Sequence, residues 1–147
     1  MIRHPIRFLV IAVSFLLFSL APCFSFDIES DAKVDPTYQF VSTKVFLADD
    51  GNADTRIAYT YLVPLLRQKG YQFVLYKNQA DLAAWAGIKN QTSQGYMTLN
   101  LYFFRADTNE TIIDAFAAKR MDRVDQTELI KALCYEIVKK LPNPSRR

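Results

Sequence analysis

Residues 96–119 read YMTLNLYFFRADTNETIIDAFAAK, and no other part of the chain shows a clearer strand pattern. Side chains alternate with a period of two over 96–106, which predicts a β-strand. One of its faces is an apolar row made of Met97, Leu99, Leu101 and Phe103. Turn-forming residues follow at 107–110, and 111–119 returns as a second strand. This stretch therefore predicts a long antiparallel hairpin with one apolar face.

The segment after this hairpin predicts a helix that must pack on a sheet. Asp125 can cap its start, Glu128 stands close to a capping-box position, and Pro142 stops it. Seven apolar side chains recur at helical spacing, namely Leu129, Ile130, Leu133, Cys134, Ile137, Val138 and Leu141. A helix with one apolar stripe needs a partner surface, and the predicted strands offer one.

The part of the chain before the hairpin predicts further elements. Alternation over 38–48 predicts a strand, and 55–69 predicts a helix capped by Asp54 and ended by Gly70, followed by a strand over 71–76. Pro64 inside the predicted helix indicates a kink or a late start. The composition of 81–89 suits helix or strand, because Ala and Leu favour helix whereas Trp and Ile fit either state.

Three stretches carry a family resemblance. They are a Leu-rich helix end followed by Gly70-Tyr71, the run Ala80-Asp81-Leu82 entering a strand, and a hairpin followed by a helix ending in VKKLP at 138–142. Together they resemble a family of small bacterial envelope proteins, mostly lipoproteins, catalogued as a domain of unknown function. The resemblance implies that 81–89 is a strand, and it supplies no catalytic residues.

The expected fold class is α+β. We expect a two-layer sandwich whose mostly antiparallel sheet has four or five strands, with two helices on one face. The expected element order is β-α-β-β-β-β-α. The domain is predicted to span 38–142, between a flexible leader over 26–37 and a disordered tail over 143–147.

Residues 1–25 have the pattern of an export signal. Arg3 and Arg7 precede an apolar run, FLVIAVSFLLFSLA, at 8–21. The run is shorter than the roughly 20 residues that span a bilayer, which favours a cleaved signal over an anchor. Cleavage is expected before Phe26, or before Cys23 if the lipobox-like LAPC sequence directs lipidation of that thiol. Either route predicts a protein of the periplasm or associated with the outer membrane.

Composition argues against most enzyme classes. The only histidine, His4, lies in the export signal, so the processed domain lacks the residue that Ser-His-Asp triads and most zinc sites need. Four scattered glycines form no phosphate-binding loop. The net charge of +3 falls close to neutral without Arg3 and Arg7, which argues against a nucleic-acid partner. We expect no catalytic residues, no cofactor and no metal.

The remaining candidates for chemistry have simpler structural interpretations. Asp49, Asp50 and Asp54 form the densest acidic cluster, which suits a solvated turn and a helix cap. Cys134 lies in the apolar stripe of the last predicted helix, where a buried, unreactive thiol is expected.

Aromatic side chains are the more interesting feature. Six of them could line an exposed sheet face, namely Tyr96, Tyr102 and Phe104 from the first hairpin strand and Tyr71, Phe73 and Tyr76 from a neighbour. Such a face would bind a partner, or the rings would complete the core or a dimer contact. The first hypothesis is a non-catalytic envelope adaptor or assembly module with a protein partner. The alternatives are a carrier of lipid or a small apolar ligand, and a carboxylate-based hydrolase of envelope glycan.

Overall fold

The computed structural model describes residues 27–91, 95–121 and 125–145. Within them the chain forms six strands, two α-helices and a short 3-10 helix. The strands are β1 (Glu29–Val34), β2 (Lys44–Leu47), β3 (Gln72–Val74), β4 (Leu82–Gln91), β5 (Tyr96–Arg105) and β6 (Thr111–Arg120), and the helices are α2 (Ala53–Lys69), α3 (Gln126–Lys139) and η1 (Lys77–Gln79).

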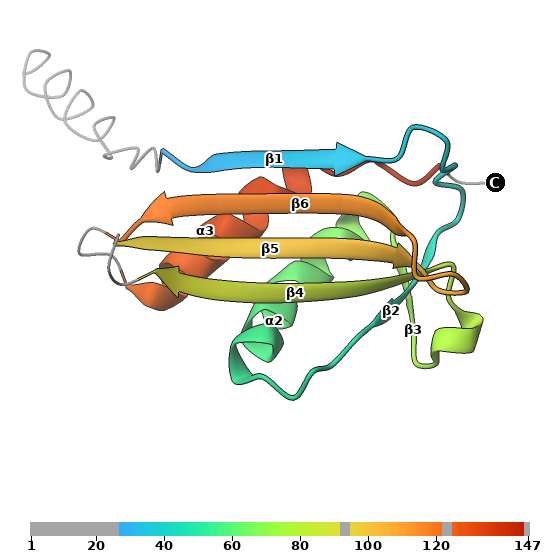
Figure 1. The fold of residues 1–147 in the computed structure, drawn as a ribbon, viewed down its shortest axis with the longest axis horizontal. Helices are drawn as coiled ribbons and strands as arrows, with labels where there is room; N and C mark the ends of the chain where they lie inside the picture. The colour runs from blue at the N-terminus through green and yellow to red at the C-terminus, as the bar shows by residue number, and fades with distance from the viewer. Residues whose placement is uncertain (1–26, 92–94, 122–124, 146–147) are drawn as a thin grey trace, which may run out of the picture.

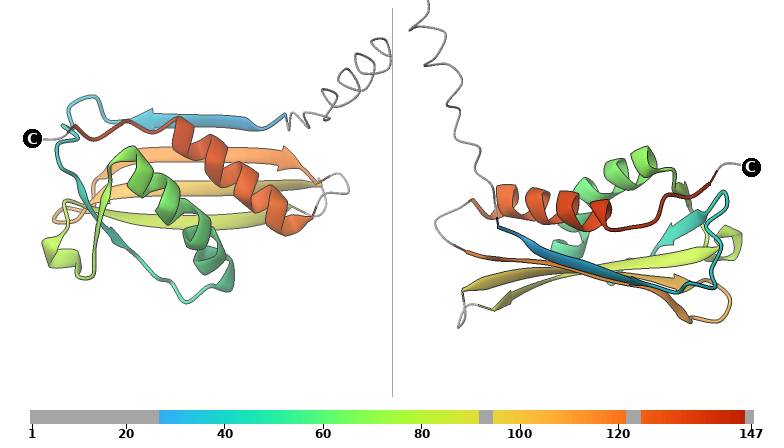
Figure 2. Two further views of the ribbon diagram at one scale, coloured as in Figure 1. Left: turned by 180° about the vertical axis from the view of Figure 1, so that it is seen from behind. Right: turned by 90° about the horizontal axis from the view of Figure 1, so that it is seen from above.

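The strands form one mixed sheet in the order β1-β6-β5-β4-β2-β3. β1, β6, β5 and β4 pair antiparallel, whereas β2 lies parallel to both β4 and β3. Both helices cover the same face of this sheet (Figures 1 and 2). The predicted α+β class and the placement of both helices on one face are confirmed. The prediction of four or five mostly antiparallel strands is corrected to six strands in a mixed sheet.

The hairpin supplies the floor of the core. Met97, Leu99, Leu101 and Phe103 of β5 are fully buried beneath the helices, as the alternation predicted. The β6 partners of the last three are smaller, with Ala117 opposite Leu99, Ala115 opposite Leu101 and Ile113 opposite Phe103. Small residues beside large ones leave room for α3 to approach the sheet.

α3 forms as the sequence predicts. The Asp125 side chain accepts a 2.9 Å hydrogen bond from the backbone N–H of Thr127, which satisfies one free donor of the first turn. The predicted apolar stripe is buried against the sheet. Cys134 belongs to it, and burial raises the pKa of its thiol to about 12. The thiol is therefore protonated at neutral pH, which agrees with the expected unreactive role.

α2 begins earlier than predicted. Its N-cap is Asn52, whose side chain accepts a 2.9 Å hydrogen bond from the backbone N–H of Asp54, so Asp54 is not the cap. The helix is continuous through Pro64, which is exposed. It ends at Gly70, whose φ of 111° lies in the left-handed region that glycine adopts without strain.

β4 is a strand although its alanines favour helix. Ala84 and Ala86 are fully buried, and they lie on the side of the sheet that α2 covers. The hydroxyl of Tyr59 on α2 donates a 2.6 Å hydrogen bond to the carbonyl of Ala48 and lies 3.1 Å from that of Ala84. Tertiary packing therefore outweighs local propensity here.

The predicted boundaries need three corrections. The expected leader over 26–37 contains β1, which pairs with β6 and buries Ala32 and Val34 in part. The strands expected over 38–48 and 71–76 are shorter, because continuous pairing is confined to β2 and β3, and Val41 makes only an isolated bridge to Ser145. The expected tail is tied to the domain, since the backbone N–H of Ser145 donates a 2.7 Å hydrogen bond to Phe40.

The predicted export signal, including Cys23, lies outside the described residues. Of the described helices, neither combines the length and the hydrophobicity that crossing a bilayer requires.

Candidate functional site

The sheet face opposite the helices carries a row of aromatic rings. We call it the helix-free face, and the strand register places six aromatic side chains on it, namely Phe46, Trp85, Tyr96, Tyr102, Phe104 and Phe116. The ring centroids of Trp85 and Tyr102 are 5.7 Å apart, and those of Tyr102 and Phe104 are 6.0 Å apart. The interplanar angles of 26° and 17° make both pairs stacked, which restricts the rings to one orientation.

Strand register places polar side chains beside these rings. Trp85, Tyr102 and Asp114 lie directly opposite one another on β4, β5 and β6, and Lys33 of β1 continues the same row. The next row holds Gly87, Asn100, Phe116 and Asp31 in the same order of strands. A hollow of about 110 Å³ opens where Asp31, Lys33, Asp114 and Phe116 meet. The face therefore combines apolar area with an ammonium group and carboxylates.

Trp85 is held in place from two sides. Its six-membered ring lies over Gly87, where a Cβ would come within 2.9 Å of Cζ2, closer than real Cβ atoms approach. Its indole nitrogen donates a 3.0 Å hydrogen bond to Oδ2 of Asp50, in the loop between β2 and α2. The backbone N–H of Asn52 and then the indole hold the pKa of Asp50 below its ordinary value, so this acceptor is ionised at neutral pH.

The structure divides the six predicted aromatic site residues into two groups. Tyr96, Tyr102 and Phe104 do lie on the helix-free face, with Tyr96 43% exposed at its end. Tyr71 does not belong there, since it is 2% exposed in the core and its hydroxyl donates a 2.8 Å hydrogen bond to Pro142.

The predicted positions of Phe73 and Tyr76 are also wrong. Phe73 is opposite Val45 on the helix-covered side, with the guanidinium of Arg67 5.7 Å from its ring. Tyr76 is exposed beyond the end of β3. The error arose because β3 joins the far side of β2, so it is not a neighbour of β5.

Trp85 is the functional candidate that the sequence analysis missed. The signal was present, because Trp85 alternates with the apolar residues Leu82, Ala84, Ala86 and Ile88. This alternation did not identify Trp85 as a surface residue, because the composition of 81–89 also suits a helix, in which alternate residues do not share a face. The link to Asp50 depends on a contact between distant segments, which alternation does not encode.

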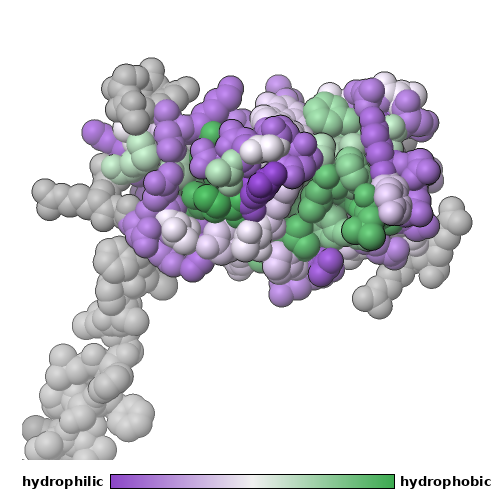
Figure 3. Space-filling view, turned by 90° about the horizontal axis from the view of Figure 1, so that it is seen from below, coloured by the Kyte–Doolittle hydropathy of each residue, from purple (hydrophilic) through white to green (hydrophobic). Residues whose placement is uncertain are grey.

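A second surface lies at the β3 edge of the sheet. It is a shallow groove of about 300 Å³ lined by Phe46, Leu47, Val63, Arg67, Phe73, Val74 and Leu75. Leu75 is 83% exposed beside it. Figure 3 shows a hydrophobic area toward the end of the molecule at which β2 and β3 lie. An apolar groove beside the outer edge of a sheet is a typical protein-contact surface.

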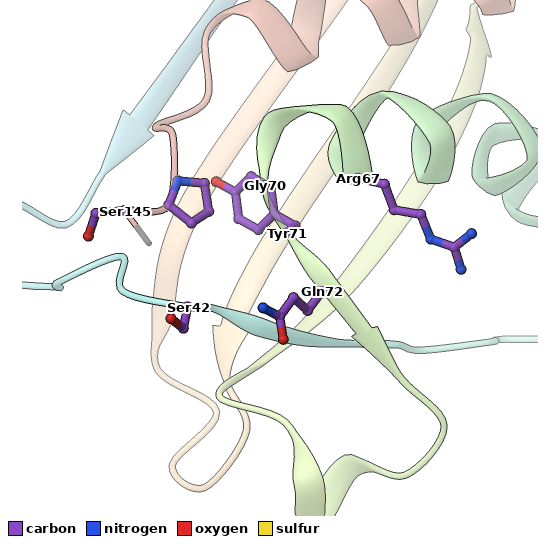
Figure 4. Close-up of a pocket in the computed structure, with 7 residues that line it drawn as sticks. Ser42, Arg67, Gly70, Tyr71, Gln72 and Ser145 are labelled. Atoms are coloured by element: carbon purple, nitrogen blue, oxygen red, sulfur yellow. The ribbon is translucent and has the colours of Figure 1, made fainter. Parts of the chain in front are cut away.

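A third hollow, of about 450 Å³, lies where α2 ends and the C-terminal segment passes β2. Its lining is mainly polar, from Ser42, Arg67, Gly70, Tyr71, Gln72, Pro144 and Ser145. Figure 4 shows that Arg67 extends away from Ser42 and Ser145. These polar groups do not converge on a single point, so the hollow does not assemble a set of reacting groups.

In the acidic cluster, the carboxylates of Asp49 and Asp50 accept hydrogen bonds that stabilise the loop between β2 and α2. Asp49 accepts from the backbone N–H of Gly51 and from Arg56, and both lower its pKa. Asp50 accepts from Asn52 and Trp85, as described above. Two ionised carboxylates do not supply the protonated acid of a glycosidase pair. No three His, Cys, Asp or Glu side chains gather as a metal site anywhere in 27–91, 95–121 or 125–145.

Comparison by sequence finds no matching family model and no matching curated protein. Solved structures do match in fold. The chain is similar to PelC from Paraburkholderia phytofirmans, a dodecamer, with 9% identity, a TM-score of 0.57, and coverage of 78% of this chain and 97% of that one. A PelC variant dodecamer in another crystal form gives 9% identity and a TM-score of 0.56, with 80% and 99% covered.

A PDZ-domain protein from Parabacteroides distasonis gives 11% identity and a TM-score of 0.55, covering 86% of this chain but 38% of that one. At such identities the likeness shows the fold alone.

Proposed function

We propose that this chain is an exported, non-catalytic protein of the bacterial envelope that binds a protein partner through its helix-free face, as an adaptor or assembly module. The observation that carries the proposal is the stack of Trp85, Tyr102 and Phe104 on a sheet face that no described helix covers. Ordered aromatic rings are efficient interface anchors, because little side-chain entropy is lost when they bind.

The electrostatics of this face favour a protein partner over an apolar ligand. Asp31, Lys33 and Asp114 border the rings on the β1 side, as polar residues border the apolar centre of protein interfaces. A carrier of lipid would need an apolar cavity between helices and sheet. The hollows at the end of α2 and at the β3 edge open at the surface instead, and Arg67 contributes a charged group to both.

Three further points support the proposal. The Asp49 and Asp50 carboxylates serve the β2–α2 loop, which weakens the hydrolase alternative. The PelC chains that share the fold form dodecamers, so this fold is compatible with assembly into larger complexes. The export pattern of residues 1–25 and the lipobox-like sequence at Cys23 support an envelope location.

A photo-crosslinking experiment tests the binding face. The full chain is expressed in its own host with a photoreactive amino acid at position 102, and a matched control carries it at position 135. Tyr102 is half-buried on the helix-free face, whereas Tyr135 is an exposed aromatic on α3. We expect one discrete crosslinked partner at position 102 that is lost when Phe104→Ser is added. Equal crosslinking at both positions, or none at position 102, would contradict the proposal.

The same expressed protein tests the location. Its intact mass distinguishes a lipidated start at Cys23 from a plain start at Phe26. A native chain that keeps residues 1–25 and stays in the cytoplasm would refute export.

A further inference from the structure

The two outer edges of the sheet differ in chemistry. β1 is the first strand and β3 the last, and each pairs on one side only within the described residues. The outer edge of β3 continues into Leu75 and Tyr76, which are both well exposed, and borders the groove that holds Phe73. The edge strands of natural sheets usually carry charged side chains that discourage pairing with another chain, but the residues of this edge are mainly apolar.

The charges around the two edges are opposite. The residues that flank β3 are mostly basic, with Lys44 opposite Gln72, Arg67 over Phe73, and Lys77 at the start of η1. Asp81 is the acidic residue near Lys44. The β1 region is mostly acidic, with Asp27, Glu29, Asp31 and Asp35 set against Lys33. One edge of the sheet therefore attracts the other, and each repels a second copy of itself.

The strand directions also fit. β1 runs opposite to β6, β6 to β5 and β5 to β4, whereas β2 and β3 run with β4. β1 is therefore antiparallel to β3. A second copy placed beside β3 in the same orientation would add its β1 as an antiparallel strand, with its helices on the same side of the sheet. In that position Phe73 would face the row of Ile28, Ala32 and Val34, which are only partly buried in one chain.

We propose that copies of this chain associate head to tail, with the β3 edge of one copy paired to the β1 edge of the next. This contact is heterologous, so it propagates until a ring closes or a filament forms. It differs in surface and in partner from the binding proposed for the helix-free face. The β3 edge is recognised through backbone hydrogen bonds, apolar contact at Leu75 and opposite charges, as in strand addition generally.

Two edge variants test the inference by complementation. Leu75→Glu removes the apolar contact of the β3 edge, places there a negative charge that the acidic β1 edge repels, and leaves β1 intact. Glu29→Lys combined with Asp31→Lys reverses the charge of β1 and leaves β3 intact. All three side chains are exposed, so the variants should keep the circular-dichroism spectrum and melting temperature of the wild type. Sedimentation velocity measures the mass of each protein, alone and mixed in equal amounts.

We expect the wild type to form species larger than a dimer, and more of them at low salt than at high salt. Each edge variant alone should be monomeric, and the equimolar mixture should give a dimer and nothing larger. Tyr135→Lys on α3 and Tyr102→Ser on the helix-free face should associate like the wild type. That result would separate this contact from the proposed partner site.

Two results would overturn the inference. A wild type that stays monomeric at every concentration would exclude self-association. Association that Leu75→Glu abolishes and the β1 double variant keeps would show that β3 pairs with another β3 instead.

Discussion

Trp85 and Asp50 are joined by a 3.0 Å hydrogen bond from the indole nitrogen to a carboxylate oxygen. The bond connects β4 to the loop before α2, across the edge between the two layers. It matters for the proposed binding face because Trp85 begins the aromatic stack that continues through Tyr102 to Phe104. Trp85 is also the only tryptophan of the chain, so its fluorescence reports on this face directly.

Acid should destabilise the protein through this loop. Hydrogen bonds from Asn52 and Trp85 hold the pKa of Asp50 below 3.8, and those from Gly51 and Arg56 do the same for Asp49. Because the folded-state pKa lies below the unfolded one, the stabilisation is complete above about pH 4 and is lost as the pH falls through the folded-state pKa. We expect the free energy of unfolding, measured with urea, to decrease over that range.

Asp50→Asn is the matched variant for this pH dependence. Its amide oxygen can still accept from the indole, but it does not titrate. The variant should be less stable than the wild type at neutral pH and should lose less stability below about pH 4. Identical slopes in the two proteins would show that Asp50 does not contribute.

Gly87→Ala should displace the Trp85 ring. The added Cβ would meet the ring at a distance that real Cβ atoms do not reach, so the indole must move away from Asp50. We expect a loss of about 1–3 kcal/mol in the free energy of unfolding and a shift in tryptophan emission. The cost should largely vanish when Gly87→Ala is introduced into Trp85→Ala, as a double-mutant cycle would show. An unchanged cost in that background would place the clash elsewhere.

Tyr71→Phe should weaken the link between the core and the C-terminal segment. The buried hydroxyl donates a 2.8 Å hydrogen bond to the carbonyl of Pro142, which would lose this partner. We expect a loss of about 1–2 kcal/mol in urea unfolding. Tyr76→Phe provides the control, because Tyr76 is exposed and its change should stay within about 0.5 kcal/mol. If both variants lost the same free energy of unfolding, the buried hydrogen bond of Tyr71 would not be the cause of its loss.

Phe103→Ala and Phe104→Ala separate the two faces of the sheet. Phe103 is fully buried beneath the helices, so its truncation should cost about 3–5 kcal/mol. Phe104, the next residue, lies on the helix-free face, and its truncation should cost about 1 kcal/mol. Thermal and urea unfolding measure both. A larger loss for Phe104→Ala would mean that another layer covers that face.

The sequence was most informative where the pattern is local. The alternation of 96–119 predicted β5 and β6 closely, and the stripe after Asp125 predicted α3 with its cap. The same alternation placed Tyr96, Tyr102 and Phe104 on one face. Each of these results depends on the periodicity of one segment, which a sequence displays directly.

The sequence was least informative where segments far apart in the chain pair. β1 is a polar segment that becomes a strand because β6 offers it an edge. Tyr71, Phe73 and Tyr76 were assigned to the wrong surface because nothing local says that β3 lies beyond β2. The family resemblance, rather than propensity, led to the correct strand for β4.

By itself the sequence determined the hairpin, both helices and the α+β class, because burial of one face imposes a period that the residues must follow. Only the tertiary structure decided the order of the six strands, the place of Trp85 beside Asp50 and the contrast between an acidic β1 edge and a basic β3 edge. These features arise from contacts between residues distant in the chain, whose free energy depends on the whole arrangement and leaves no periodic trace in any one segment.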